Sequence, residues 1–255
     1  MLTKVHARRL REIYRSAGWP SQDLIEVELL AEGLLERMRT AEGHECLRVT
    51  EAGIRLLADT LVKNRAARSA HEALVEQVAR EMVRAGRIAW RGLSLRALVP
   101  ADMPQDATDP TDASAMGTAG EGAPVADARR WCIAMPDVFS IRNTTVEAYA
   151  QPIVHEVKVR RADLLGELRN PAKRAAYLDL SSECWYVLGC DAKGRPIASE
   201  DEIPAECGVM LCEQGRLIVV RNAPRRAKTV SFGTWIALAR ATPVTGLDAE
   251  TQGLL

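Results

Sequence analysis

Residues 152–159 read PIVHEVKV, and residues 136–139, shortly before them, read PDVF. Successive side chains of an extended chain point to opposite faces, so Val154, Glu156 and Lys158 share one face of a predicted strand. The other face carries Ile153, His155, Val157 and Val159. Two charges on one face of an otherwise apolar strand indicate either an exposed sheet edge, with a structural ion pair, or the lining of a site.

Asp137 is the second acidic residue of this arrangement. It follows Pro136, which interrupts ladder pairing, so we expect Asp137 to lie where two neighbouring strands diverge. Carboxylates from adjacent strands are oxygen ligands suited to a hard divalent cation, and the Val157 carbonyl is a natural third ligand. The predicted metal ligands are therefore Asp137, Glu156 and Val157.

This ligand set predicts phosphodiester chemistry. Mg²⁺, or alternatively Mn²⁺, lowers the pKa of a bound water and neutralises charge on a phosphate. Lys158 lies two residues from Glu156 on the same face, from where it can orient or deprotonate that water and stabilise the pentavalent phosphorus. Asp137, Glu156 and Lys158 are the predicted catalytic residues.

The segments around these residues predict an α/β fold with a mixed sheet. Period-2 and helical patterns predict a helix, two long strands, the strand already described, a helix that Pro171 must break or kink, a buried strand and a hairpin turning at Glu213–Gln214–Gly215. In that order they span residues 71–86, 87–99, 129–141, 152–159, 162–180, 184–189 and 208–222.

PDVF followed by HEVKV resembles the PD-(D/E)xK restriction-endonuclease-like superfamily. The sequence KVRRADLLGELRNPAKRAAYLDLSSECWYVL, residues 158–188, is similar to that of MmcB-like DNA-repair-type endonucleases, although Arg161 and Leu164 depart from the family pattern. The positions in register are Lys158, Ala162, Asp163, Tyr177, Cys184, Trp185 and Tyr186. The resemblance covers about residues 70–222 and implies a restriction-endonuclease-like core.

The same resemblance implies further site residues. It implies an acid from the first helix of the core, for which Glu76 is the choice and Glu72 and Glu81 the alternatives. It also implies a basic helix after the site, which would supply Lys173 or Arg174 as a further active-site base. The residues expected on DNA from this part are Arg160, Arg161, Lys173 and Arg174.

The first 63 residues resemble a winged helix-turn-helix of the MarR type. Two predicted helices, the second capped by Ser21, precede strands at residues 34–39 and 45–50 and a helix over residues 51–64. One helix fewer than usual fits before the wing. The resemblance implies duplex DNA bound through Arg37, Arg39 and Arg48; a packing or dimerisation module is the alternative.

Charge is distributed unevenly along the 255 residues. The 34 basic and 34 acidic residues give a net charge of zero. Residues 101–128 contain six of the acidic residues and no Lys or Arg, so the parts on either side are mildly basic. A mildly basic surface is what binding to a polyanion requires. This acidic segment lacks aromatic residues, which predicts a disordered insert at a hairpin tip. No signal peptide or membrane span is evident, and six cysteines without CxxC spacing fit a cytoplasmic location.

The sequence thus predicts a winged-helix-like domain over residues 1–63 and a nuclease-like domain over residues 64–255. The predicted function is a Mg²⁺-dependent DNA endonuclease, acting on duplex or branched DNA in repair or in defence against foreign DNA. Cutting both strands would favour a homodimer. The alternative is a non-catalytic DNA-binding or regulatory protein built on a nuclease-like scaffold.

Overall fold

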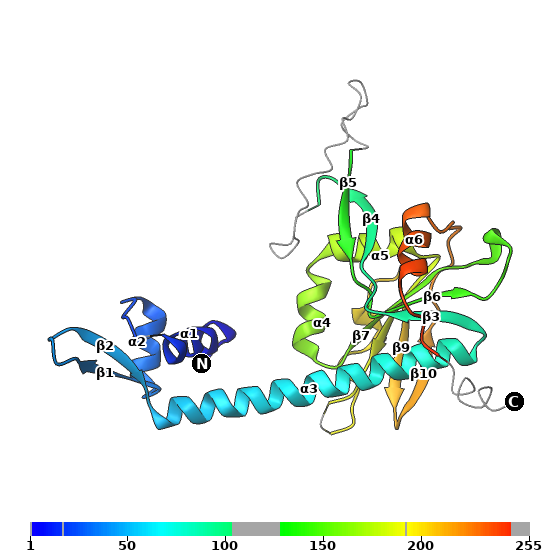
Figure 1. Cartoon of the computed structure of the whole chain (residues 1–255). Coiled ribbons are helices and arrows are strands. Elements are labelled where there is room, and N and C mark those ends of the chain that lie inside the picture. Colours follow the sequence, from blue (N-terminus) through cyan, green and yellow to red (C-terminus); the bar gives the residue numbers. More distant parts are fainter. Residues whose placement is uncertain (1, 17, 104–127, 192, 246–255) are drawn as a thin grey trace, which may run out of the picture. The chain divides into compact units, whose positions relative to one another are not determined.

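A computed structural model describes residues 2–16, 18–103, 128–191 and 193–245 (Figure 1). The chain forms two compact units, Met1–Ser69 and Ala70–Leu255. The division falls inside α3, which runs without a break over Glu51–Arg84. The prediction of two separate helices was therefore wrong here: the residues between them are mainly Ala and Arg, both strong helix formers, and include no Gly or Pro.

The first unit contains two helices, a hairpin and the start of α3. Its elements are α1 (Lys4–Arg15), α2 (Leu24–Ala31), β1 (Leu35–Arg39) and β2 (Glu45–Val49). The two strands pair antiparallel, so the predicted hairpin is confirmed. A core of its own, with Leu10, Leu29 and Leu47 among its buried members, holds the unit together.

The N-terminus of α2 differs from the expectation. Asp23, not Ser21, is the N-cap, and its carboxylate accepts a hydrogen bond from the Glu26 backbone. The buried Glu26 side chain reaches back and accepts from the backbone N–H groups of Ser21 and Gln22. Asp and Ser cap helices about equally well, so the contacts of Glu26 select between them.

The second unit is built on a six-stranded mixed sheet with the order β10-β9-β8-β7-β6-β3. Its strands are β3 (Arg87–Arg91), β6 (Val138–Arg142), β7 (Ile153–Lys158), β8 (Glu183–Leu188), β9 (Gly208–Glu213) and β10 (Arg216–Arg221). The pairs β7–β8 and β8–β9 are parallel and the others are antiparallel. The predicted mixed α/β fold and the hairpin at Gln214–Gly215 are confirmed.

Two predicted long strands are each divided in the structure. The chain leaves β3 at Gly92, whose φ of 59° is a left-handed conformation favoured by glycine, and continues into β4 (Leu95–Pro100). Likewise β5 (Arg129–Ala134) is separated from β6 at Pro136. The strands β4 and β5 form a separate antiparallel pair. The predicted insert begins and ends at this hairpin, and its residues 104–127 lie outside the described residues.

The predicted break at Pro171 is confirmed. α4 (Arg161–Leu168) ends before it, and α5 (Pro171–Leu180) begins with it, capped by the Asn170 side chain. Proline is suited to the first helical position because it lacks the N–H that would have no partner there. α6 (Phe232–Arg240) is the last helix described.

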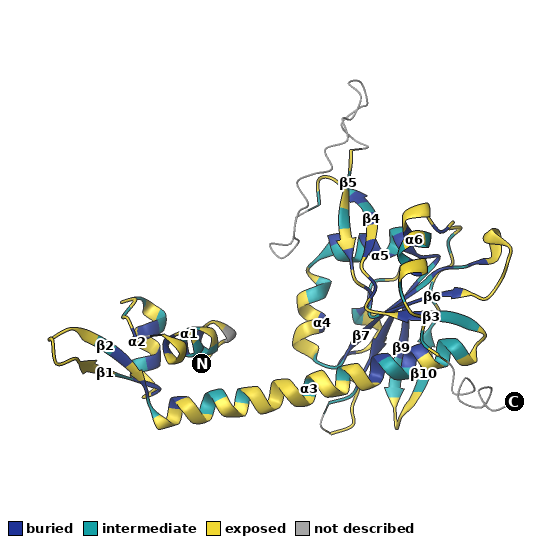
Figure 2. Ribbon diagram, in the orientation of Figure 1, coloured by how far each residue is buried: buried dark blue, intermediate teal, exposed yellow. Residues whose placement is uncertain are grey.

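Helices cover both faces of the large sheet (Figure 2). On one face, Leu74, Val75 and Val78 of α3 pack with Val157 of β7. On the other, Tyr177 of α5 packs with Val154, in a core that also includes residues of α6 and of the β4–β5 hairpin. The predicted alternation along β7 is thus present. No helix within the described ranges is long and apolar enough to cross a membrane.

Candidate active site

Asp137 lies where β6 and β7 separate. The pairing of the two strands ends at Val138 and His155, and beyond that point the Asp137 carboxylate accepts a hydrogen bond from the Val157 N–H (2.8 Å). The N–H and C=O of one strand residue point to the same side, so the Val157 carbonyl is directed toward the side where Asp137 lies. The divergence expected from Pro136 therefore brings Asp137 beside β7.

Glu156 and Lys158 lie together on the face of β7 that α5 covers. Lys158 Nζ is 2.5 Å from Glu156 Oε1, and the Tyr177 hydroxyl donates to Glu156 Oε2 at 2.8 Å. The side chains are 3% exposed for Glu156 and 10% for Lys158. A charge this deeply buried is tolerated when it is paired and hydrogen-bonded, and both oxygens of Glu156 meet that condition.

Glu167 of α4 and Lys173 of α5 complete a charge cluster, a name used below for Glu156, Lys158, Glu167 and Lys173. Glu167 Oε2 lies 2.8 Å from Lys158 Nζ and 2.6 Å from Lys173 Nζ. Lys173 Nζ also lies 2.7 Å from Glu156 Oε1. Two carboxylates and two ammonium groups thus alternate in space and neutralise one another.

Glu167 was not among the predicted site residues. In the sequence, Glu167 is one of several charged residues on a predicted helix. Its spacing from Glu156 along the chain matches no helix or strand period that would predict a contact between them. The break at Pro171 sets the angle between α4 and α5 and thereby lets Glu167 and Lys173 face the same carboxylate. Lys173 was predicted in two roles, as a DNA contact or as a further active-site base, and the structure places it beside Glu156.

The pKa values of the acidic groups of the site are shifted in different directions. Burial and the negative charge of Glu156 raise the pKa of Asp137. Burial acts in the same sense on Glu156, but the positive charges of Lys158 and Lys173 outweigh it and lower the pKa of Glu156. Burial and the charge of Glu156 raise the pKa of Glu167. Glu156 is therefore the carboxylate that most firmly keeps its charge.

The two lysines are held in their protonated form. Burial would lower their pKa values, but the charges of Glu156 and Glu167 outweigh burial and raise the pKa of both Lys158 and Lys173. An amine that retains its proton is a cation and a proton donor, and it is a poor base. The contacts of Lys158 therefore support charge stabilisation and do not support the predicted deprotonation of water.

The predicted acid from α3 does not join this group. Glu76 is paired with Arg91 and, at 2.7 Å, with Arg80. The alternatives are also engaged elsewhere, Glu72 with Arg91 (2.9 Å) and Glu81 with Arg84 (2.6 Å). Each of the three carboxylates is thus paired with an arginine, and none of them contacts Glu156 or Lys158 in the described structure.

His71 is the α3 side chain that contacts the site. Its Nε2 lies 3.4 Å from Asp137 Oδ2. Nothing in the sequence favours His71, since a lone histidine at the start of a helical pattern is more often structural. Only the packing of α3 beside the start of β6 brings it to Asp137.

The arginines predicted to bind DNA after β7 are mostly engaged with carboxylates. Arg161 lies 2.8 Å from Glu202 and also donates to the Ile197 carbonyl, and Arg174 lies 2.8 Å from Glu206. Arg160 is the residue before α4, at its N-cap position. A phosphate bound at Arg161 or Arg174 would have to replace a protein carboxylate.

The hairpin arginines of the first unit show a similar pattern. Arg37 pairs with Glu45 at 3.3 Å, and Arg48 pairs with Glu36 at 2.7 Å. Arg39 lies at the end of β1, opposite Glu45, and makes no side-chain ion pair with a described residue. Arg39 is therefore the hairpin arginine best able to contact a phosphate.

Comparisons with known proteins do not assign the chain to a family. No family model and no curated protein matches it. Among solved structures it is similar to the SPO1766 protein of unknown function from Silicibacter pomeroyi, at 17% identity and a TM-score of 0.37, over 65% of this chain and 79% of that one. At that TM-score the similarity supports no conclusion about fold or function.

The residues at the strand divergence fit a Mg²⁺ site of a particular kind. No group of three or more His, Cys, Asp or Glu side chains within the described ranges is arranged to hold a metal. Mg²⁺ does not require one, because it is commonly bound by one or two carboxylates and completes its shell with water and substrate phosphate oxygens. Asp137, Glu156 and the Val157 carbonyl supply oxygen donors of this type. Burial and the charge of Glu156 raise the pKa of Asp137, and a cation beside the two carboxylates would offset both effects.

Proposed function

We propose that this chain is a metal-dependent nuclease that hydrolyses phosphodiester bonds of DNA. In this proposal the second unit is a restriction-endonuclease-like core of the MmcB-like branch, and the first is a winged-helix-like module that binds DNA. One observation carries the proposal: where β6 and β7 separate, Asp137 accepts from the N–H of Val157, the residue between Glu156 and Lys158, and Lys158 lies beside Glu156. This is the arrangement that the PD-(D/E)xK resemblance implies.

The roles follow from charge and position. Asp137, Glu156 and the Val157 carbonyl would hold Mg²⁺ or Mn²⁺. A bound divalent cation would act as a Lewis acid toward a phosphate oxygen and lower the pKa of a water molecule. Lys158, held protonated, would place a positive charge beside the phosphate as negative charge develops on it.

Glu167 supports this arrangement as a positioning residue. It contacts Lys158 and Lys173 at once, so both ammonium groups keep a partner when Glu156 turns toward a cation. Without Glu167, the two lysines would share Glu156 alone and hold it away from the metal. Tyr177 fixes the second oxygen of Glu156 from the side of α5.

The proposal is tested by cleavage assays on plasmid, linear and branched DNA with Mg²⁺ or Mn²⁺. Asp137→Asn, Glu156→Gln and Lys158→Gln are expected to lower the cleavage rate at least about 100-fold while DNA binding is retained. Glu213→Gln is the matched control, since that exposed acidic residue of the same unit lies at the β9–β10 hairpin and has no role in the proposed site. A wild-type protein that cuts neither DNA nor RNA with either metal would refute the catalytic proposal.

A second candidate function is supported by the saturation of the charge cluster. Both oxygens of Glu156 already have partners, as in a structural ion-pair network of a non-catalytic DNA-binding or regulatory protein. Calorimetric titration with Mn²⁺ separates the two. Binding that disappears in Glu156→Gln supports the nuclease, and absence of binding in the wild type supports the scaffold.

A further inference from the structure

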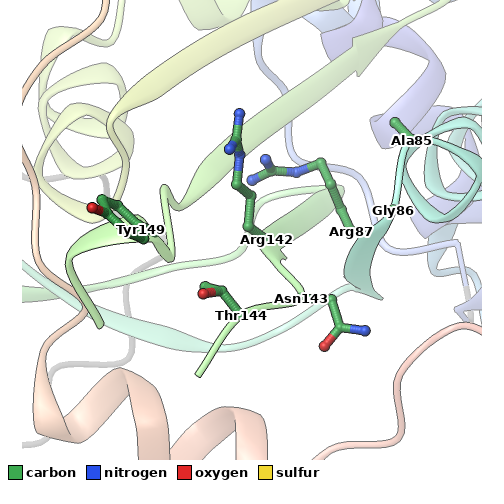
Figure 3. Close-up of a pocket in the computed structure, with 7 residues that line it drawn as sticks. All are labelled: Ala85, Gly86, Arg87, Arg142, Asn143, Thr144 and Tyr149. Carbon is green, nitrogen blue, oxygen red and sulfur yellow. The ribbon is translucent and has the colours of Figure 1, made fainter. Parts of the chain in front are cut away.

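We propose a second binding site, for the phosphate group of a nucleotide, at the junction of the start of β3 and the end of β6. A cavity of about 580 Å³ opens there. It is lined by polar and charged groups that include Arg87, Arg142, Thr144 and Tyr149 (Figure 3). The cavity lies at the opposite end of β6 from Asp137, so it is not part of the candidate active site.

Arg87 is fixed in place by neutral acceptors. Its Nε donates to Ser140 Oγ at 2.9 Å, and its Nη2 donates to the carbonyl oxygens of Ser140 (3.0 Å) and Gln151 (2.5 Å). None of these partners carries a charge. The two N–H groups on Nη1 have no acceptor within the described part of the chain, so a preorganised half of the guanidinium is available to an anion.

Arg142 adds a second positive charge at the same place. It is the direct cross-strand partner of Arg87, and the two side chains lie next to each other (Figure 3). Like charges directly opposite each other destabilise a strand pair. No carboxylate of the described residues forms an ion pair with either guanidinium, so an anion is the missing partner.

The surroundings do not neutralise the pair. Burial is the main cause that lowers the pKa of Arg87, to about 10, and the charges of Arg142 and Arg225 add to it. Among the groups that shift the pKa of Arg87, Glu183 is the one that raises it. The Glu183 carboxylate also accepts a hydrogen bond from the Trp185 indole N–H. Three arginines against one carboxylate leave a local excess of positive charge.

The chemistry of the lining favours a nucleotide phosphate over a simple carboxylate. Two guanidinium groups match a doubly charged phosphate, whose oxygens accept their paired N–H donors. The cavity is much larger than one phosphate ion, and Tyr149 at its rim is 60% exposed. An exposed aromatic ring beside an arginine is a stacking surface for a nucleobase. A free nucleotide and a single strand of nucleic acid share this chemistry.

The experiment is calorimetric titration of the full-length protein, in EDTA and at constant ionic strength, with inorganic phosphate, a 5′-mononucleotide and a short single-stranded oligodeoxynucleotide. Arg142→Gln is the main variant because Arg142 is exposed and holds no other element in place. Arg216→Gln, an exposed arginine at the β9–β10 hairpin, is the matched control. Tyr149→Ala tests whether the aromatic ring stacks on the nucleobase. Arg87→Lys removes the paired N–H donors of the guanidinium and keeps the positive charge.

Arg142→Gln and Arg87→Lys are expected to weaken mononucleotide binding about tenfold, and Arg216→Gln to leave it unchanged. Tyr149→Ala is expected to weaken the binding of the mononucleotide several-fold and to leave the binding of inorganic phosphate almost unchanged. Tighter binding of the oligonucleotide than of the mononucleotide identifies a strand as the source. Wild-type protein that binds no mononucleotide saturably, or an Arg142→Gln variant with unchanged affinity, would overturn the proposal. The nuclease proposal is independent of either result, because its test depends on cleavage and on Asp137.

Discussion

At the scale of single residues, the candidate site is a set of buried carboxylates in different electrostatic surroundings. Glu156 faces two lysines and keeps its charge, whereas Asp137 faces Glu156 and is less stable as an anion. Such differences are typical of functional sites, although structural ion-pair networks also produce them. They lead to opposite expectations for otherwise similar substitutions.

Asp137→Asn is expected to stabilise the protein while abolishing cleavage. The folded-state pKa of Asp137 is raised, so the carboxyl favours folding below its unfolded pKa and loses that contribution as pH rises through the folded value. At neutral pH the ionised side chain therefore costs stability, which an amide would remove by about 1 kcal/mol. Denaturant unfolding at pH 7 measures this gain.

Mg²⁺ provides the control for that substitution. The ion should raise the melting temperature of the wild type and leave that of Asp137→Asn unchanged, because binding to the folded state stabilises it. A variant less stable than the wild type would show that Asp137 acts mainly through its hydrogen bond to Val157.

Glu156→Gln and Glu167→Gln are expected to differ in stability although both remove one carboxylate of the charge cluster. Glu156 is stabilised as an anion, so its loss leaves the buried Lys158 and the half-buried Lys173 with one acceptor fewer and should cost ~3–5 kcal/mol. Burial raises the pKa of Glu167, so its anion is less favoured than that of Glu156 and replacing it by an amide should cost less, ~1 kcal/mol. Equal losses in denaturant unfolding would contradict this assignment of charge.

At the scale of elements, β7 combines the site with a buried structural histidine. His155 stacks on Trp185 of β8, with ring centroids 6.4 Å apart and an interplanar angle of 15°. Its Nδ1 has no hydrogen-bond partner among the described residues. Burial, assisted by the charge of Arg87, lowers the pKa of His155 to about 3.

His155→Phe is expected to reduce the sensitivity of the fold to acid. A lowered folded-state pKa means that the unfolded chain takes up the proton first, so stability is complete above pH 6.5 and falls as the solution is acidified toward pH 3. His155 alone should cost about 2 kcal/mol between pH 6.5 and pH 5. Unfolding free energies of the two proteins across this range measure the difference. Parallel pH profiles would contradict a neutral buried His155.

The β1–β2 hairpin offers a matched pair of arginines for the DNA-binding prediction. Arg39→Gln is expected to weaken binding of duplex DNA and to reduce the salt dependence by about one phosphate contact. Arg37→Gln should have a smaller effect because Glu45 already neutralises Arg37. Affinity measured at several salt concentrations tests both. Unchanged affinity in Arg39→Gln would favour a protein-interaction role for the first unit.

At the scale of the whole molecule, the two units have separate hydrophobic cores. The core of the first contains Leu29, and those of the second contain Val157 and Leu164. The cores share no residue, although α3 supplies backbone to both units. Cooperative unfolding depends on shared burial, so we expect the units to lose structure independently.

Leu29→Ala is expected to destabilise the first unit by ~2–5 kcal/mol and to leave the second unchanged, because Leu29 is fully buried in the first core. Leu164→Ala, equally buried in the second unit, is the reciprocal control. Amide hydrogen exchange resolved along the chain measures both. Equal loss of protection in the two units after either substitution would show that they unfold as one.

The sequence by itself determined the mixed α/β class, the hairpins, the break at Pro171 and the placing of Glu156 and Lys158 on one strand face. These features depend on local periods and on the backbone restrictions of proline and glycine, which act over a few residues. The sequence alone did not determine the unbroken helix α3, the division of the long strands, or the partners of Glu76.

Only the tertiary structure brought Glu167 and Lys173 to Glu156, His71 to Asp137, and Arg142 beside Arg87. Each of these contacts joins residues of different elements, and their spacing along the chain follows no helix or strand period. The packing of the elements therefore determines each contact. The site predicted from a strand alternation thus became a buried cluster of alternating charges, because burying Glu156 requires cations that the rest of the fold supplies.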